Sequence, residues 1–388
     1  MNRFFKCTSL ATLTIATLFS FNACNKPNDD ITTDEKNKKE IVTQYVNHTI
    51  IPTYKNMAQQ AESLVEKLKA IKTTPTDASV NSACETFLET RAWWEKSEAF
   101  LFGPAKDFGI DPHIDSWPLD LDALQLALSN TLQIEAMAGE EGDIFAGENL
   151  GNALLGFHGI EYILFNNGSP RNISEISDLN LTYAIAVAGD LRNRCYQLEV
   201  SWAGEDNVEE SHFNKVEELE MNYTVNGSDN SYGDNMLNAG NPGSTYPSLT
   251  SAMMAIVDGC KVIADEVGTS KIGKPHFGED INYIESPYSQ KSIEDFYDNI
   301  ISIKNAYMGG IEDQRDETKS IHAYIKKLDE GLDAEATNAI ENALEKIHGM
   351  AAPFVNNISD ASAAEAIKAC TELDEVLSRV NNTIRTNI

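Results

Sequence analysis

The stretch LDEVLSRVNNTI, residues 373–384, decides the fold class because its apolar residues recur with helical spacing. Leu373, Val376, Leu377, Val380 and Ile384 fall at i, i+3, i+4, i+7 and i+11, which places them on one stripe of an amphipathic helix. Nearly every segment after residue 40 shows the same periodicity, and no convincing alternating strand pattern occurs. The sequence therefore predicts an all-α protein.

The predicted helices form two groups, separated by the turn-rich stretch NNGSPRN at residues 166–172. They cover residues 41–72, 79–102, 119–137 and 149–165, and then 179–202, 248–267, 292–308, 334–348 and 361–384. Pro52 is expected to kink the first of them, because proline removes one backbone hydrogen bond. We predict two similar antiparallel helix-bundle domains, at 41–170 and 171–388, with a loop-rich insertion near 204–247.

The first 24 residues are typical of an export signal, with a basic start, a short apolar core and Ala23 directly before Cys24. A small residue before cysteine is similar to a bacterial lipobox, which implies removal of residues 1–23 and lipid attachment to Cys24. An ordinary signal peptide cut elsewhere is the alternative. Residues 24–40 are polar and lack periodicity, which predicts a flexible tether. We expect an exported protein anchored to a bacterial membrane, with the outer membrane preferred and its periplasmic or surface side left open.

Charge and cysteine content narrow the function classes. The chain has 30 Lys and Arg against 60 Asp and Glu, a formal net charge of −30, which argues against a nucleic-acid partner. Beyond the N-terminal segment lie Cys84, Cys195, Cys260 and Cys370, far apart in sequence. No CxxC motif for a metal or redox site occurs, and these four cysteines are either paired or free.

The stretch GFHGIEYILF, residues 156–165, contains a histidine and a glutamate at helical spacing. His158 and Glu161 lie on the same helix face and can converge on one point, and the two glycines beside them allow close approach of a ligand or another helix. A buried pair that only joins two helices by hydrogen bonds is the alternative. Neither HExxH nor HxxEH occurs, because Tyr162 stands where the second histidine of HxxEH would fall.

Four motifs together resemble the imelysin family of exported bacterial proteins, which carry a G-x-H-x-x-E signature. They are GFHGIEYILF, RAWWEKSEAFLFGP at 91–104, DSWPLD at 115–120 and ESPYSQKSIEDFYDNIISIKNAYMGG at 285–310. The resemblance spans residues 41–388. It implies an all-helical protein of two similar bundles, with a site around the histidine-glutamate pair in the crevice between them. It also implies a link to iron, since members are iron-regulated or encoded with iron-uptake components. The family was named as a peptidase.

The signature positions correspond to Gly156, His158 and Glu161. The resemblance implies a metal-binding or ligand-binding site built from His158, Glu161, Arg91, Glu98, Asp115, Ser97 and Ser289; its motifs also include Trp117, Ser286, Tyr288 and Asn299. Arginine can orient a carboxylate with two hydrogen bonds, and the two further acids can supply hard oxygen ligands. A structural network that holds the bundle together is the alternative for the arginine, Ser97 and the aspartate.

Two functions follow as hypotheses. The preferred one is a binding protein that takes part in iron acquisition and captures iron, another divalent metal or an iron-containing small molecule. Its expected partners are iron-uptake components, and it would contact the membrane through its lipid anchor. The alternative is a metallopeptidase that uses His158 and Glu161; it needs a further ligand and an open water position, and no catalytic residue is assigned. A surface scaffold whose crevice binds a partner or a glycan also stays open.

Overall fold

The computed structural model describes residues 33–387, and nearly all of its regular structure is helical. Within this range the strands are limited to β1 (Phe165–Asn166) and β2 (Ser169–Pro170), which pair antiparallel. The all-α prediction is confirmed. The export signal and Cys24 lie outside the described residues. No helix within residues 33–387 is both long and apolar enough to cross a membrane.

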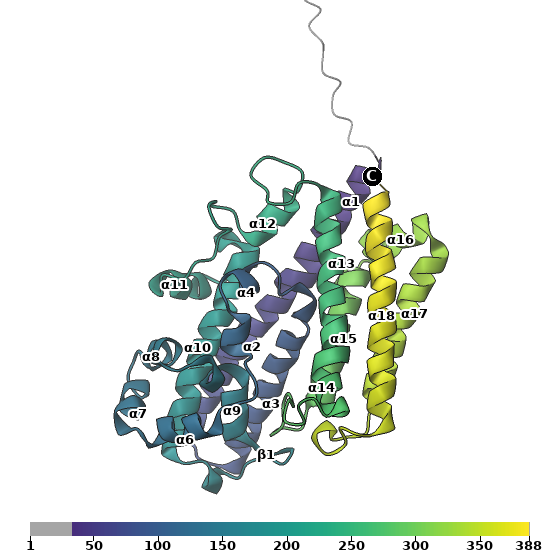
Figure 1. Cartoon of the computed structure of the whole chain (residues 1–388). Coiled ribbons are helices and arrows are strands. Elements are labelled where there is room, and N and C mark those ends of the chain that lie inside the picture. Colours follow the sequence, from purple (N-terminus) through teal and green to yellow (C-terminus); the bar gives the residue numbers. More distant parts are fainter. Residues whose placement is uncertain (1–32, 388) are drawn as a thin grey trace, which may run out of the picture.

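The first group of long helices is built around α2. It contains α2 (Ile51–Thr73), α3 (Asp77–Glu95) and α10 (Asp178–Ala203). α1 (Thr33–Tyr45), which precedes α2 in the sequence, extends from this group to the second group of helices. α2 packs against α3 and α10, whereas α1 packs against α13 (Figure 1). Leu64, Leu68 and Ile71 are fully buried at helical spacing on α2, so its apolar stripe forms the core of this group.

Six short helices connect α3 to α10. They are α4 (Pro104–Asp107), α5 (Asp111–Ile114), α6 (Leu121–Ser129), α7 (Thr131–Met137), α8 (Gly142–Asn149) and α9 (Gly156–Leu164). Helices α6 to α9 pack on α10, and α9 also contacts α3 and α5 (Figure 1). This layer therefore places α9, with the histidine-glutamate pair, between the long helices and the short α5.

The second group of long helices occupies the C-terminal half. It contains α13 (Leu249–Glu266), α15 (Ser292–Met308), α16 (Ile321–Leu328), α17 (Glu330–His348) and α18 (Ala361–Thr386). α18 packs against α13 and α17, and α15 packs against the same two helices (Figure 1). On α18, Leu373, Leu377, Val380 and Ile384 are fully buried, so four of the five residues of the predicted stripe form its core face.

The N-terminal helices differ from the prediction in two places. α1 already begins at Thr33, so the predicted tether over 24–40 does not hold from residue 33 on. Lys38 explains why this polar segment can pack: it is 2 % exposed, and its ammonium lies 2.8 Å from Asp34. The predicted helix over 41–72 is divided by a π-helical turn directly before α2, and Pro52 follows in the first turn of α2, where a missing N–H does not break the helix.

The connections also differ from the prediction. The expected loop-rich insertion near 204–247 contains two helices, α11 (Glu210–Glu218) and α12 (Tyr232–Leu237); α14 (Gly273–Phe277) follows α13. The domain boundary at residues 170/171 stays a prediction, but α10, which lies beyond it in sequence, packs against α2, α8 and α9. The helix therefore belongs structurally with the first group.

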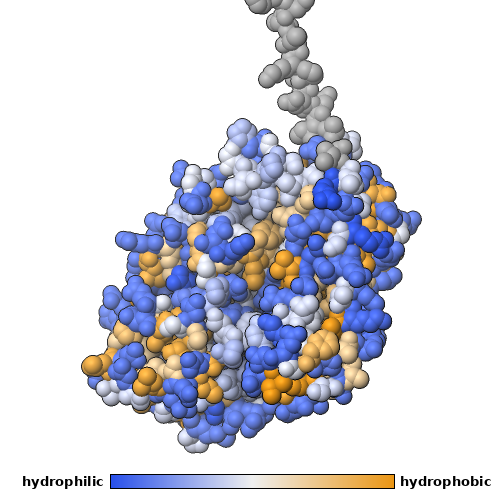
Figure 2. Space-filling model, in the orientation of Figure 1, coloured by the Kyte–Doolittle hydropathy of each residue, from blue (hydrophilic) through white to orange (hydrophobic). Residues whose placement is uncertain are grey.

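The surface and the cysteines agree with a well-packed, acidic protein. Hydrophilic residues dominate the face drawn in Figure 2, and hydrophobic residues appear there in scattered groups. Cys84, Cys195, Cys260 and Cys370 are buried and unpaired, which resolves the choice that the sequence left open. Burial raises the pKa of the Cys84 thiol to about 12, so this side chain packs as a small apolar group rather than a reactive thiolate.

Candidate functional site

Gly156 positions the histidine-glutamate pair. It begins α9 with a φ of +67°, and a Cβ at this residue would lie 1.8 Å from the carbonyl oxygen of Ile114. Only glycine allows this approach, so the start of α9 rests directly against the last turn of α5. Asp115 follows that turn, and its Oδ1 lies 3.0 Å from Nε2 of His158.

Glu161 links α9 to the loop that precedes α15. Its Oε1 accepts three hydrogen bonds, from the backbone N–H of Tyr288 (3.2 Å) and from the backbone N–H and hydroxyl of Ser289 (2.8 and 2.7 Å). Its Oε2 has no hydrogen-bond partner and lies 3.5 Å from Nδ1 of His158. Both side chains are 1–2 % exposed. The two facing atoms are therefore buried and close together, and the glutamate oxygen has no hydrogen-bond partner.

Arg91, on α3, is the central cation of the site. Its guanidinium contacts Asp115, and its Nη2 lies 2.6 Å from Glu285 and 2.6 Å from Glu95. Glu95 is four residues further along α3, while Glu285 belongs to the loop before α15, so this one side chain joins the two helix groups. Arg91 is 2 % exposed, and the guanidinium lies 5.0 Å from the centre of the Phe157 ring.

Asp115 is held as a carboxylate by its donors. Trp94 donates from Nε1 to Oδ2 at 2.7 Å, while Arg91 and His158 contact Oδ1. Burial by itself would raise the pKa of Asp115, but the guanidinium and the imidazole outweigh it and hold that pKa well below its ordinary value. Burial likewise favours neutral His158, yet its hydrogen bond with Asp115 and the nearby carboxylate of Glu161 raise its pKa to about 9.

Lys271 is a second buried cation, on the π-helical turn Val267–Ile272 that follows α13. Its ammonium lies 3.1 Å from Glu285, 3.5 Å from Glu98 and 3.6 Å from Glu95. The side chain is 1 % exposed, which is rare for lysine without partners. Burial lowers the pKa of Lys271, but these carboxylates outweigh burial and raise it well above its ordinary value.

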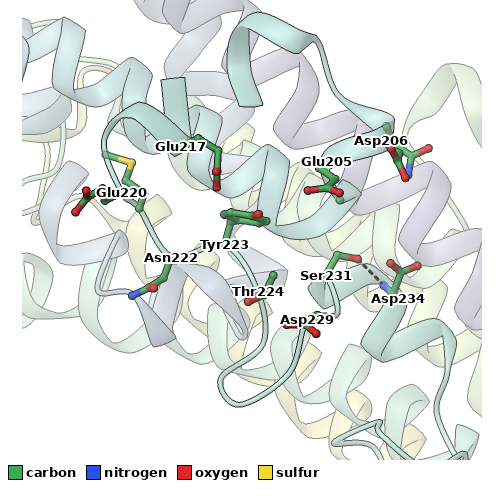
Figure 3. A pocket seen from close by; sticks show the side chains of 13 residues that line it. Glu205, Asp206, Glu217, Glu220, Asn222, Tyr223, Thr224, Asp229, Ser231 and Asp234 are labelled. Carbon is green, nitrogen blue, oxygen red and sulfur yellow. Dashed lines mark hydrogen bonds between the residues drawn. The ribbon is translucent and has the colours of Figure 1, made fainter. Parts of the chain in front are cut away.

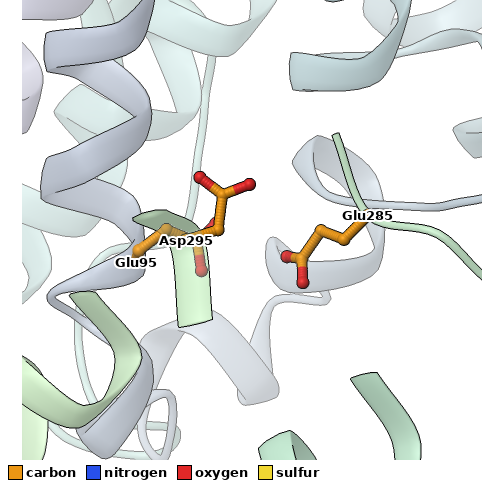
Figure 4. Close-up of side chains that lie close together, drawn as sticks. All are labelled: Glu95, Glu285 and Asp295. Atoms are coloured by element: carbon orange, nitrogen blue, oxygen red, sulfur yellow. The ribbon is translucent and has the colours of Figure 1, made fainter. Parts of the chain in front are cut away.

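Carboxylates are in excess over cations in this network. Glu95, Glu285 and Asp295 bring ligand atoms within 4.8 Å of one another, as do Glu95, Glu98 and Asp115 (Figure 4 shows the first group). Burial raises the pKa of Asp295 to about 7 and the pKa values of Glu95 and Glu98 well above their ordinary range. The network pairs two permanent cations and one histidine with six buried carboxylates: Glu95, Glu98, Asp115, Glu161, Glu285 and Asp295. This excess of buried negative charge favours either protonation of some of the carboxylates or the binding of an added cation.

The network is reached from two sides. A cavity of about 220 Å³ touches Asp115, Trp117 and Glu98, and a larger one of about 740 Å³ also reaches Glu98 and runs between α13 and the segment around α4 and α5. Asp111 lines both cavities, and burial raises its pKa to about 7. On the other side Ser289 lines a cavity of about 560 Å³. Members of the network therefore line cavities on two sides.

A separate acidic cavity of about 630 Å³ lies among α11, α12 and the loops beside them. Figure 3 shows its carboxylates, which come from Glu205, Asp206, Glu217, Glu220, Asp229 and Asp234. All six are exposed. None of the predicted site residues lines this cavity, so it is not part of the buried network.

The structure brings most predicted site residues into one network. Arg91, Glu98, Asp115, His158, Glu161 and Ser289 are all members. Ser97 is the exception, because its hydroxyl donates to the carbonyl of Trp94 at 2.7 Å and closes the turn after α3. Asn299 donates to Glu95 at 2.5 Å, and Ser286 donates to Asp295.

Four members were missed from sequence: Glu95, Lys271, Glu285 and Asp295. Glu95 follows Arg91 by one helical turn, and Glu285 and Asp295 lie inside a motif already singled out, so these three carried a usable signal. Lys271 belongs to no motif and carried none.

Comparisons with known proteins agree with this architecture. The sequence profile of the imelysin family matches residues 50–380. Iron-regulated protein A of Synechococcus elongatus is 27 % identical over 295 residues, which cover 76 % of this chain and 69 % of that protein. The crystal structure of a protein assigned as an iron-regulated protein A precursor from Parabacteroides distasonis has a TM-score of 0.76 at 26 % identity, covering 90 % of this chain and 95 % of that one. An imelysin-like protein from Psychrobacter arcticum shares the fold, with a TM-score of 0.58 at 12 % identity over 91 % and 94 % of the two chains.

Proposed function

The chain belongs to the imelysin family, and from this premise we propose that it is an exported lipoprotein that binds iron, or an iron-containing small molecule, in iron acquisition. The binding site is the buried network around His158 and Glu161. Relatives named iron-regulated protein A support the link to iron.

The observation that carries the proposal is the unpartnered, buried Oε2 of Glu161, which lies 3.5 Å from Nδ1 of His158. Metal–ligand bonds of about 2.0–2.2 Å leave neighbouring ligand atoms roughly 3–4 Å apart, so this separation suits two ligands of one ion. Asp115 already holds Nε2, the other ring nitrogen. A carboxylate in that place orients a metal-binding histidine and makes it more basic.

The charge of the surrounding network supports a bound cation. Asp295 accepts a hydrogen bond from the hydroxyl of Ser286, and burial outweighs the nearby Arg91 and raises the pKa of Asp295 to about 7. An added cation would stabilise its ionised form together with those of Glu95 and Glu285, whose oxygens lie close by. Imidazole together with carboxylate oxygens suits iron and similar first-row metals.

Iron binding by the mature protein, purified without chelator, tests the proposal. Titration calorimetry under anaerobic conditions should show that the affinity for Fe²⁺ falls by at least about 100-fold in Glu161→Gln, because the variant lacks the carboxylate oxygen that binds the ion. The amide oxygen of the glutamine can still accept the hydrogen bonds from Ser289, so the local structure is retained. Glu148→Gln, an exposed acid, serves as the matched control and should bind as the wild type does. Equal affinity in Glu161→Gln and wild type would overturn the site.

Two further parts of the proposal need their own measurements. Fatty-acid labelling of the wild type and its loss in Cys24→Ala would establish the lipid anchor; labelling that persists in Cys24→Ala would contradict it. The metallopeptidase alternative stays a prediction. Peptide cleavage that disappears both in Glu161→Gln and on chelation would support that alternative over simple binding.

A further inference from the structure

A second histidine, His212 on α11, has one ring nitrogen without a hydrogen-bond partner although the side chain is fully buried. Its Nδ1 lies 2.6 Å from Oε2 of Glu199 on α10, and its ring stacks on Tyr196 with centroids 3.9 Å apart and planes inclined by 18°. The stack and the buried glutamate fix the orientation of the imidazole. Nε2 therefore points in one defined direction.

Two carboxylates face that nitrogen. Oε2 of Glu62, on α2, and Oε2 of Glu209, at the start of α11, each lie 4.0 Å from Nε2 of His212. Gln59 donates to the other oxygen of Glu209 at 3.1 Å, so the oxygen nearer the histidine is left available. Both glutamate side chains are about half exposed, at 49 % and 51 %. Nε2 of His212 is thus held in a fixed position below the surface, whereas the two carboxylates beside it belong to half-exposed side chains that can rotate.

We infer that His212, Glu62 and Glu209 form a second metal site, for a divalent transition metal ion such as Zn²⁺. Two bonds of about 2.0–2.2 Å to a tetrahedral ion place the ligand atoms roughly 3.3–3.6 Å apart, so both glutamates must move closer to His212 than their present 4.0 Å. They must also move toward each other, because the three ligand atoms do not all lie within 4.8 Å of one another, and their half-exposed side chains are free to rotate. Glu199 supplies the carboxylate that holds the remaining ring nitrogen, as Asp115 does for His158.

The two sites are independent. The residues of the buried network come from α3, α9, α15, the loop before α15 and the turns that follow α3, α5 and α13, whereas the second site uses α2, α10 and α11 with the residue before it. One imidazole with two or three carboxylate oxygens and an open position favours zinc or a neighbouring first-row ion over calcium or magnesium, which prefer oxygen ligands alone. The competing explanation is a protonated histidine that only balances the charge of the glutamates.

Zinc titration of the mature full-length protein separates these explanations. The wild type should bind one equivalent of Zn²⁺ that the Glu62→Gln/Glu209→Gln variant lacks, with affinity at this site at least about 100-fold weaker. Both substitutions are at half-exposed positions and leave the stacked histidine in place, so folding is retained. Glu66→Gln/Glu210→Gln removes two exposed charges from the same helices and should keep that equivalent.

Two more arms complete the test. Glu199→Gln should weaken zinc binding about 10- to 100-fold, because it changes the group that holds Nδ1 of His212. His158→Ala should leave this equivalent unchanged, so failure at one site cannot be mistaken for failure at the other. Zinc binding with the same stoichiometry and affinity in Glu62→Gln/Glu209→Gln and wild type would overturn the inference and leave the protonated histidine as the explanation.

Discussion

Replacing Arg91 with methionine should strongly destabilise the protein at neutral pH. The guanidinium is 2 % exposed and contacts Asp115, Glu95 and Glu285, all of them buried. Methionine fills part of the same volume but leaves these carboxylates without their main cation. Removing one partner of a buried ion pair costs about 3–5 kcal/mol, and we expect a loss in this range in the free energy of unfolding.

The size of this loss should depend on pH. In the wild type Arg91 and His158 hold the pKa of Asp115 well below its ordinary value of 3.8, so the stabilisation is complete above that value and is lost only as the pH falls through the folded-state pKa. Without Arg91, burial dominates and favours protonated carboxyls. Lowering the pH from 7 to 5 should therefore reduce the difference between variant and wild type.

Urea unfolding at both pH values measures the effect. Lys304→Met, which removes a partly exposed partner of Glu341, is the control and should cost about 0–1 kcal/mol at both pH values. In the double variant Arg91→Met/Glu285→Gln one of the carboxylates that Arg91 balanced is neutral and Lys271 can pair with the others, so part of the stability should return. A loss below about 1 kcal/mol at pH 7, or a loss that is the same at pH 5 and pH 7, would refute this account of the network.

Three further predictions concern the same site. Gly156→Ala should destabilise by at least about 1–2 kcal/mol in urea unfolding because its φ is +67° and a Cβ would overlap a backbone carbonyl; Gly151→Ala, with open space around it, should be neutral, and equal effects would contradict this. Iron affinity should rise about tenfold per pH unit between pH 6 and pH 8, since the ion displaces a proton from His158, whose pKa is raised to about 9; a flat calorimetric profile would argue against His158 as a ligand. Trp94→Phe removes a donor to buried Asp115 and should cost about 1–3 kcal/mol by thermal or urea unfolding, whereas unchanged stability would show that this bond contributes nothing.

Much of the architecture follows from local patterns. The stripe on α18 and the spacing of His158 and Glu161 are properties of single helices, and both are visible in the sequence because helical periodicity needs no tertiary information. The π-helical turn before Pro52 and the helices α11 and α12 were not predicted. A π-helical turn and short helices in an Asn- and Gly-rich segment depend on tertiary packing more than on intrinsic propensity.

The candidate site is harder to predict from the sequence than the helices are, because its members are distant in sequence. Arg91 and Glu285 are 194 residues apart, and Lys271 reaches the carboxylates from a turn whose sequence suggests an exposed lysine. The family motifs identified Arg91 and Asp115, but they did not indicate that the carboxylates outnumber the cations. That imbalance appears only when all six acids are placed in one buried volume.

The sharing of ions between the two helix groups has a consequence for how the chain can be divided. Arg91 of the first group is neutralised partly by Glu285, and Lys271 beyond α13 is neutralised partly by Glu95 and Glu98 of the first group. A fragment that ended before α13 would keep acids whose cation had been removed, and the complementary fragment would keep a lysine that had lost two of its counterions. Each half therefore supplies counterions to the other, and we expect either fragment alone to be less stable than the same helices are in the full chain.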